Sequence, residues 1–341
     1  MSSATPHCLI VGAGMAGRVA ARRLAKAHWQ VTVLEKSKGF GGRMATRRIG
    51  EARFDHGTQA FTLHGMFFRA LIEKMQDQGL IESWCRGFLN ADQQLSLDGY
   101  LRFFAAEGMN SIGKYLARDL DVRCNETVSN IALLNDALPR WQVSCNSGLQ
   151  LQADALIMTP PLPQSLKLIE KLPGIDTQSS QWEQLKAVKY DPCLAVMAVL
   201  DGPSGLPEPG GLANADPMSP LKWLADNRQK GISPVEAVTV HGTAHFSRQH
   251  WKTDRDEAGK KLWEAAKAQY IQANALALQT HGWRYAEVQD PLDVNFMSLP
   301  TPVPLILAGD AFGDRFHQLE GAAMSGLDAA KSLLKQSAPA S

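Results

Sequence analysis

The chain has 341 residues, 45% of them hydrophobic, which is enough for about two globular domains with cores of their own. Its 35 lysine and arginine residues nearly balance its 34 aspartate and glutamate residues, which excludes a strong attraction to nucleic acid or to an anionic membrane surface. Small molecules are therefore the expected partners. The five cysteines are scattered and form no C-x-x-C pair, which argues against a disulfide framework or a zinc site. Without a leader-like or membrane-spanning segment, the sequence predicts a cytoplasmic protein.

The N-terminal segment is predicted to form a strand, a helix and a strand, at residues 8–11, 16–26 and 31–34. Gly12-Ala13-Gly14-Met15-Ala16-Gly17 lies at the first turn, where glycines allow backbone N–H groups to approach a pyrophosphate. Glu35 ends the second strand, where a carboxylate can accept hydrogen bonds from ribose hydroxyls and would repel a 2′-phosphate. An ordinary glycine-rich turn would leave Glu35 unexplained. The pattern therefore predicts a dinucleotide site.

Two further segments favour a flavin dinucleotide. Gly41-Gly42-Arg43 follows Glu35, and paired glycines let the chain pass close to a cofactor while the guanidinium faces its phosphates. Gly309-Asp310 follows an apolar strand at 304–308, and an aspartate there suits the ribityl hydroxyls. Glu320-Gly321-Ala322 opens a predicted helix at 321–334, whose positive end suits the flavin edge where negative charge collects on reduction. We therefore expect FAD, with plain turns as the alternative at both glycine segments.

The middle of the chain alternates between two groups of elements. Residues 122–151 predict a β-meander and residues 154–158 a buried strand. Strands are also expected at 193–200 and 235–241, and a helix at 254–279. If the terminal and middle pieces share one sheet, the FAD-binding domain is discontinuous and comprises residues 1–61, 109–176 and 300–341. Residues 62–108 and 177–299 would then form the substrate domain of this α/β (α+β overall) protein.

Taken together, these motifs resemble those of the flavin amine oxidase superfamily, and the finer pattern is similar to the renalase-like enzymes, especially the bacterial ones. The matching segments are 55–62, 108–112, 190–192, 223–230, 241–243, 246–247 and 281–286. The sequence departs from the renalase pattern at Ala60, Ala311 and Gln318. The absence of any cysteine after Cys193 agrees with non-covalent flavin, because the related monoamine oxidases attach theirs through a cysteine near the C-terminus.

The resemblance implies a Rossmann-like FAD-binding domain of the p-hydroxybenzoate hydroxylase type and a second domain with a mixed sheet. It also implies a reaction, in which the 1,2- and 1,6-dihydro isomers of NAD(P) are oxidised to NAD(P)+ and dioxygen reoxidises the flavin to give hydrogen peroxide. Two alternatives stay open. One is an amine or other CH–NH oxidase of the same superfamily, although no lysine lies in the matched motifs near the expected flavin N5. The other is a non-catalytic flavin-binding sensor.

The expected functional residues fall into two sets. The cofactor-binding set is Gly12, Gly14, Met15, Ala16, Gly17, Glu35, Lys36, Gly41, Gly42, Arg43, Met44, Gly309, Asp310, Glu320, Gly321 and Ala322. The candidates for the substrate pocket and catalysis are His281, Gln59, Phe61, Trp283, Trp223 and Tyr285. His281 can hydrogen-bond a nicotinamide carboxamide, but a structural histidine fits the pattern as well, and the aromatic residues have the hydrophobic core as their alternative.

A metal site was also weighed at three histidines. His241 and His245 would lie on one face of a continued strand, and His250 follows them. Neither a cysteine nor a carboxylate completes a ligand pattern there, so we expect no metal and interpret these residues as strand surface.

Overall fold

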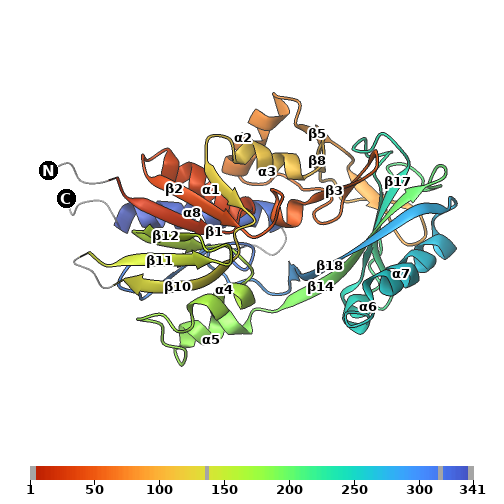
Figure 1. Ribbon diagram of the computed structural model, residues 1–341. Coiled ribbons are helices and arrows are strands. Elements are labelled where there is room, and N and C mark those ends of the chain that lie inside the picture. Colours follow the sequence, from red (N-terminus) through yellow and green to blue (C-terminus); the bar gives the residue numbers. More distant parts are fainter. Residues whose placement is uncertain (1–4, 135–137, 314–317, 337–341) are drawn as a thin grey trace. The chain divides into compact units, whose positions relative to one another are not determined.

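The computed structural model describes residues 5–134, 138–313 and 318–336. The chain divides into two compact units (Figure 1): unit 1 comprises residues 1–42, 113–189 and 288–341, and unit 2 comprises residues 43–112 and 190–287. Each unit is discontinuous in sequence. The chain leaves unit 1 after Gly42, whereas the sequence suggested a crossing after residue 61, because the intervening hairpin packs on a strand of unit 2.

Unit 1 is built on a six-stranded sheet of order β19-β20-β13-β1-β2-β9. Its pairs are parallel except that β19 runs antiparallel to β20. Continuous apolar runs are typical of parallel strands covered on both faces, and all five residues of β1 are buried. The strands are β1 (His7–Val11), β2 (Gln30–Glu35), β9 (Asp121–Cys124), β13 (Ala155–Met158), β19 (Met297–Leu299) and β20 (Leu305–Leu307).

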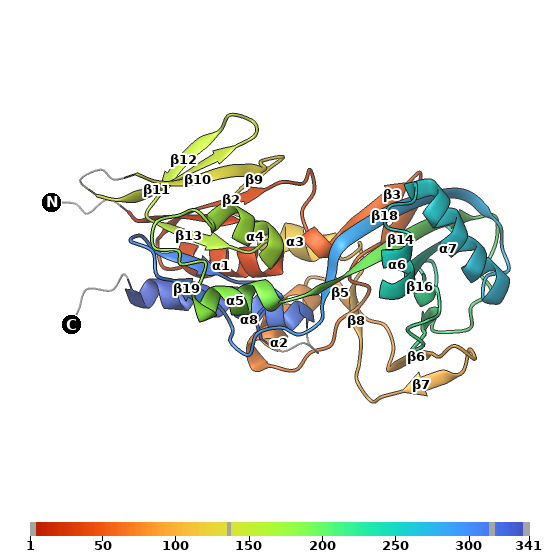
Figure 2. The same cartoon turned by 90° about the horizontal axis from the view of Figure 1, so that it is seen from below.

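Both faces of this sheet are covered (Figure 2). Helices α1 (Met15–Ala25) and α8 (Gln318–Gln336) lie on one side and pack closely, since a Cβ atom on Gly326 would lie only 2.0 Å from the Ala16 carbonyl oxygen. On the other side lies an antiparallel sheet of β10 (Val128–Leu134), β11 (Arg140–Cys145) and β12 (Gln150–Ala153). The predicted meander is thus confirmed for these strands, whereas β9 joins the parallel sheet. Helices α4 (Leu162–Ile169) and α5 (Ser180–Ala187) complete the unit.

Unit 2 is built on a seven-stranded sheet of order β18-β14-β17-β16-β15-β6-β7. Helices α6 (Ala244–Gln249) and α7 (Arg255–Gln269) pack on β14 and β17, and the hairpin of β3 (Thr46–Ile49) and β4 (Ala52–Asp55) also contacts β17. The sheet strands are β6 (Gly87–Leu89), β7 (Leu95–Leu97), β14 (Tyr190–Leu200), β15 (Gly211–Ala213), β16 (Leu221–Asp226), β17 (Ala237–Gly242) and β18 (Ala275–Val288). The smaller elements are η1 (Gly42–Met44), α2 (Met66–Gln76), β5 (Ile81–Ser83), β8 (Phe103–Ala105) and α3 (Asn110–Leu116).

Two sequence predictions in this unit are wrong. The helix expected at 254–279 ends at Gln269, and residues 275–288 form strand β18. Alanine and leucine favour a helix locally, but at Ala275–Leu278 pairing with the sheet overrides that preference. The strand predicted at 235–241 is confirmed as β17, but the interpretation of His245 as strand surface is wrong. The strand ends at Gly242, because the Thr243 hydroxyl accepts a hydrogen bond from the Phe246 N–H and starts α6, which contains His245.

Within the described residues, no helix is both long enough and apolar enough to cross a membrane.

Candidate functional site

The glycines of the first turn in unit 1 are required by space. Gly12 has a φ of +96°, and a Cβ atom there would lie 2.5 Å from the Thr159 hydroxyl oxygen. A Cβ atom on Gly17 would lie 2.0 Å from the Gly12 carbonyl oxygen. Gly14 is the N-cap of α1 and supplies no capping side chain, and the first turn that follows, with Met15 and Ala16, contains no acidic residue. This helix end can therefore receive an anion.

Glu35 is fixed beside this turn. Its side chain is buried, with Oε2 accepting a hydrogen bond from the Ala13 N–H at 2.9 Å and Oε1 accepting one from the Ser37 N–H at 2.8 Å. A carboxylate has further lone pairs, so ribose hydroxyls can still donate to it. Lys36, which the sequence grouped with Glu35, is exposed, and its Nζ lies 3.4 Å from Gln164 Oε1.

The Gly-Gly-Arg segment runs past the same turn. Gly41 and Gly42 both have positive φ, and a Cβ atom on Gly42 would lie 3.6 Å from the Gly14 Cα. Arg43 begins unit 2, where its Nη1 donates to the Tyr285 carbonyl oxygen at 3.3 Å. Met44 is buried. The two glycines thus pass close to the nucleotide turn, while the Arg43 guanidinium has a strand carbonyl as a partner.

The C-terminal motif lies where β20 meets α8. Gly309 has a φ of +130°, and its N–H donates to the Ser325 hydroxyl at 2.8 Å, which ties the end of the strand to the helix. Asp310 follows and is partly exposed. In the first turns of α8, Glu320 is buried, whereas Gly321 and Ala322 keep part of their surface accessible. Small residues at a helix N-terminus leave room for a flat ligand.

Taken together, the residues of unit 1 fit an anionic dinucleotide. The turn has no room for side chains at Gly12 and Gly17, and within the described ranges the N-terminus of α1 has no side chain that accepts a hydrogen bond from its N–H groups. Glu35 is held in place at the end of β2. Sequence reasoning missed Arg18, which follows Gly17 directly. Its side chain is completely buried, and none of its three nitrogens has a hydrogen-bond partner in the described part of the chain. An arginine directly after the last glycine of the turn was the available signal.

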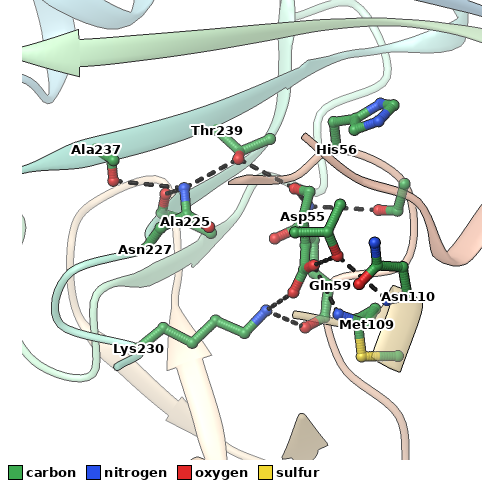
Figure 3. A network of polar contacts seen from close by, with 12 residues as sticks. Asp55, His56, Gln59, Met109, Asn110, Ala225, Asn227, Lys230, Ala237 and Thr239 are labelled. Atoms are coloured by element: carbon green, nitrogen blue, oxygen red, sulfur yellow. Dashed lines mark hydrogen bonds and ion pairs between the residues drawn. The ribbon is translucent and has the colours of Figure 1, made fainter. Parts of the chain in front are cut away.

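In unit 2, a buried ion pair joins Lys230 to Asp55 (Figure 3). The distance from Lys230 Nζ to Asp55 Oδ2 is 2.9 Å, and neither side chain is exposed. Asp55 Oδ1 accepts hydrogen bonds from the Thr46 hydroxyl at 2.7 Å and from the Met109 N–H at 2.8 Å. Lys230 also donates to the Gln59 carbonyl oxygen at 2.6 Å. This lysine is therefore committed to holding separate segments together.

The same network leaves one acceptor unused. Gln59 Nε2 donates to the Gly57 carbonyl oxygen at 3.3 Å and also to that of Asp55, whereas Gln59 Oε1 is buried without a partner among the described residues. The Asp55 carbonyl oxygen also accepts from the Thr239 hydroxyl at 3.0 Å, and Asn227 Nδ2 donates to that hydroxyl at 3.0 Å (Figure 3). Gln59 is thus held from its amide nitrogen, with its oxygen available to a donor.

An aromatic–imidazole cluster is made of His56, three residues before Gln59, and of His281 and Trp283 on strand β18. The His56 and Trp283 rings are stacked, with centroids 5.2 Å apart and an interplanar angle of 19°. His281 meets both rings edge-on, at 4.8 Å from His56 and 4.3 Å from Trp283. Trp283 Nε1 lies 2.7 Å and His241 Nε2 lies 3.2 Å from the His56 carbonyl oxygen. Because a carbonyl oxygen only accepts, this contact assigns the proton of neutral His241 to Nε2.

The imidazoles of this region are held neutral. Burial lowers the pKa of His56 to about 3, and the nearby His281 and Arg47 lower it further. Burial also lowers the pKa of His241 to about 4, with Lys222 acting in the same direction. The pKa of His281 is lowered by burial and then by Arg47 and Arg255.

Among the described residues, no three His, Cys, Asp or Glu side chains gather as metal ligands.

The other predicted pocket residues lie in different groups. Phe61 packs against Phe68 and Phe103, with ring centroids 5.8 and 6.1 Å away. Trp223 meets Phe88 edge-on at 4.5 Å. Tyr285 meets the Tyr190 ring at 5.5 Å. The structure therefore brings Gln59, His281 and Trp283 together around His56 and His241. Trp223 is the cross-strand partner of His241 in the β16–β17 pair, whereas Phe61 and Tyr285 meet other aromatic rings.

The comparisons with known proteins agree with this layout. Residues 10–73 match the model of an NAD(P)-binding Rossmann-like domain, and residues 77–334 match that of flavin containing amine oxidoreductases. Renalase from Mus musculus is 24% identical over 323 residues, which cover 89% of this chain and 92% of that protein. Among solved structures, putrescine oxidase bound to putrescine has a TM-score of 0.67 at 14% identity, covering 97% of this chain and 99% of that one. A conjugated-linoleic-acid-producing fatty acid isomerase from P. acnes has a TM-score of 0.67 at 12% identity, covering 99% and 100%.

The structural likenesses concern the fold alone, but the family match extends over most of the chain and includes segments of both units. The Rossmann-like nucleotide-binding unit and the mixed sheet of the second unit are both present in this chain, as the sequence predicted. The chain belongs to the flavin containing amine oxidoreductases.

Proposed function

We propose that this protein is an FAD-dependent oxidase that takes a hydride from the 1,2- and 1,6-dihydro isomers of NAD(P), with dioxygen as the final acceptor. The observation that carries the proposal is the aromatic–imidazole cluster of unit 2, in which Trp283 stacks on the buried, uncharged His56 and keeps part of its own surface accessible. A dihydronicotinamide ring is also flat and uncharged, and it becomes cationic only after the hydride has left.

The reaction needs no protein base. The donor loses one hydride and becomes a stable pyridinium. Dioxygen takes up the two electrons and the proton of that hydride, together with one further proton, and becomes hydrogen peroxide. FAD, when bound, supplies the ring that accepts the hydride and passes two electrons to dioxygen. The residues of this chain bind and orient the donor. Gln59 Oε1, which has no partner among the described residues, can accept a hydrogen bond from the carboxamide NH₂, and His281 can provide a second polar contact.

The charges near the cluster favour this donor over an amine. Arg47 and Arg255 lower the pKa of His281, so their positive charges act on the same region and would repel an ammonium group. Asp55, the buried carboxylate closest in sequence, is already bound to Lys230 and to the donors of Thr46 and Met109. An amine substrate would find no free buried carboxylate there. An amine or other CH–NH oxidase nevertheless remains the competing proposal, since it fits the family.

The test is anaerobic mixing of the purified holoprotein with each candidate donor, followed by the visible flavin absorbance. We expect the 1,2- and 1,6-dihydro isomers to bleach the flavin within the mixing time and a panel of primary amines to leave it oxidised. Admitting air should then restore the colour with about one peroxide released per donor oxidised. Acid precipitation should release the flavin into solution, because we propose that it is bound without a covalent link.

Bleaching by amines and not by the dihydro isomers would replace this proposal by the amine-oxidase one. Bleaching by neither class would instead favour a flavin-binding protein without turnover. The departures from the renalase pattern at Ala60 and Ala311 make the comparison among donors informative.

A further inference from the structure

Arg18 is a buried charge that the proposed chemistry does not use. It lies in α1, one turn after the Gly14 N-cap, and its side chain has no exposed surface. Its three side-chain nitrogens lack hydrogen-bond partners in the described ranges 5–134, 138–313 and 318–336. The guanidinium carbon lies 5.2 Å from the centroid of the Phe40 ring, which provides a cation–π contact but no hydrogen bond.

The Arg18 side chain packs near the loop that follows β2. A Cβ atom on Gly113 would lie 2.3 Å from Arg18 Nη1 and 3.3 Å from the Gly41 Cα, so the absence of a side chain at Gly113 makes room for the guanidinium. Gly42, the next residue of that loop, approaches Gly14. The charge thus lies near the Gly41–Gly42 segment and is shielded from water.

The group stays charged in spite of its burial. Burial lowers the pKa of Arg18 to about 10, and the nearby Glu35 and Cys124 act in the opposite direction. At neutral pH the guanidinium is therefore protonated, and nothing as close as a salt bridge neutralises it in the described residues. A buried charge without a counter-ion destabilises the folded protein unless another charge within reach offsets it.

The geometry indicates where that other charge would lie. Helical side chains incline towards the N-terminus of their helix, which brings the Arg18 guanidinium back towards Gly14. The N-terminus of α1 has no acidic residue in its first turn and no side-chain cap. Since water is excluded from Arg18, its field is screened far less than that of a surface arginine. The helix end and the buried charge therefore act on the same place.

We propose that Arg18 is a buried counter-charge for the pyrophosphate of the dinucleotide, acting through space from its buried position near the Gly41–Gly42 loop. The inference rests on the proposed function for the identity of that ligand, FAD. It assigns to Arg18 a double effect: the charge destabilises the flavin-free protein and strengthens binding of a diphosphate.

The test is calorimetric titration of the full-length, flavin-free chain with ADP, which has the diphosphate, and with adenosine, which lacks it. Arg18→Met should weaken ADP binding at least tenfold, about 1.4 kcal/mol, and change adenosine binding less than twofold. The thermal midpoint of the flavin-free variant should equal or exceed that of the wild type. Arg18→Lys should keep the preference for ADP within threefold. Arg23→Met on the same helix, a partly exposed position, is the matched control and should change neither affinity.

Equal weakening of ADP and adenosine, together with a lower thermal midpoint, would show a packing role and overturn the proposal. Should Arg18→Met fail to fold, Arg18→Gln, which keeps a polar head group without the charge, gives the same comparison. A wild-type chain that binds neither ADP nor FAD would refute the cofactor assignment itself. A wild type that binds both, with variants that bind ADP unchanged, would refute only the role of Arg18.

Discussion

The buried ion pair between Lys230 and Asp55 gives the sharpest prediction about stability. Lys230→Met keeps the length of the side chain and removes its charge. The variant loses the contact of Nζ with Asp55 Oδ2 at 2.9 Å and its hydrogen bond to the Gln59 carbonyl oxygen at 2.6 Å. It leaves the Asp55 carboxylate buried with only the donors of Thr46 and Met109. Removing one partner of a buried pair costs about 3–5 kcal/mol, and most of this is the unpaired charge that remains.

The double variant Lys230→Met/Asp55→Asn separates the unpaired charge from the lost hydrogen bonds. Once both charges are gone, only a few hydrogen bonds worth about 1 kcal/mol each are missing, so we expect a destabilisation of about 2 kcal/mol. The double variant should therefore be more stable than Lys230→Met alone. Lys186→Met is the matched control, because Lys186 pairs with Glu183 at 3.0 Å on the surface, and it should change stability by less than about 1 kcal/mol.

The assay is urea unfolding of the holoprotein, followed by circular dichroism and by tryptophan fluorescence. Coincident transitions would justify a single free energy of unfolding for each variant. If Lys230→Met unfolds with the same midpoint as Lys186→Met, or if the double variant is as unstable as the sum of its single variants, the buried pair does not have the role inferred here.

Three further predictions concern the cofactor turn and the imidazoles. Glu35→Ala and Asp310→Ala should each lower the flavin retained after gel filtration at least tenfold while the far-ultraviolet spectrum stays unchanged; fully yellow variants would contradict the assigned site. Gly17→Ala should destabilise the chain by about 1–3 kcal/mol, because its Cβ would lie 2.0 Å from the Gly12 carbonyl oxygen, whereas Gly14→Ala, with no atom within 4 Å, should stay within about 0.5 kcal/mol in thermal unfolding. Burial lowers the pKa of His56 from 6.5 to about 3, so between these values the unfolded chain binds a proton that the folded chain does not, and stability is lost as the pH falls below about 6.5. His56→Gln should flatten the decline of the urea midpoint between pH 7 and pH 5, and an equally steep decline would show that other groups cause it.

The nucleotide unit could be predicted largely from local patterns. The tight turn at Gly12–Gly17 and the position of Glu35 depend on residues close in sequence, and the observed β1, α1 and β2 lie within a few residues of the predicted bounds. Parallel strands that are covered on both faces are apolar throughout, which makes them visible in the sequence. The terminal and middle pieces share one sheet, as the sequence suggested, but the order of its strands was not predicted.

The candidate substrate region could be predicted only in part. Gln59, His281 and Trp283 were selected from motifs, but Lys230 and Asp55 are 175 residues apart, and the pairing of their charges is a property of the fold. Strand β18 was missed because the run Ala275–Leu278 has helical propensity, although it adds to the edge of a sheet. The burial of Arg18 without a hydrogen-bond partner could not be predicted either, since it depends on how distant segments pack in three dimensions.

The two units handle buried charge in opposite ways, and the difference bears on what each can bind. In unit 2, the buried ammonium of Lys230 is fully neutralised by Asp55, and the nearby imidazoles of His56 and His241 have pKa values far below neutrality. The imidazoles themselves are thus uncharged, and the nearest positive charges that act on them include Arg47 and Arg255. In unit 1, Arg18 is buried in the helix with the uncapped N-terminus, without a hydrogen-bond partner among the described residues, and Glu35 is the opposite charge that acts on it from nearby. An anionic dinucleotide is stabilised by the second arrangement, and the neutral imidazoles of the first suit an uncharged ring, as the proposed oxidation of a dihydronicotinamide requires.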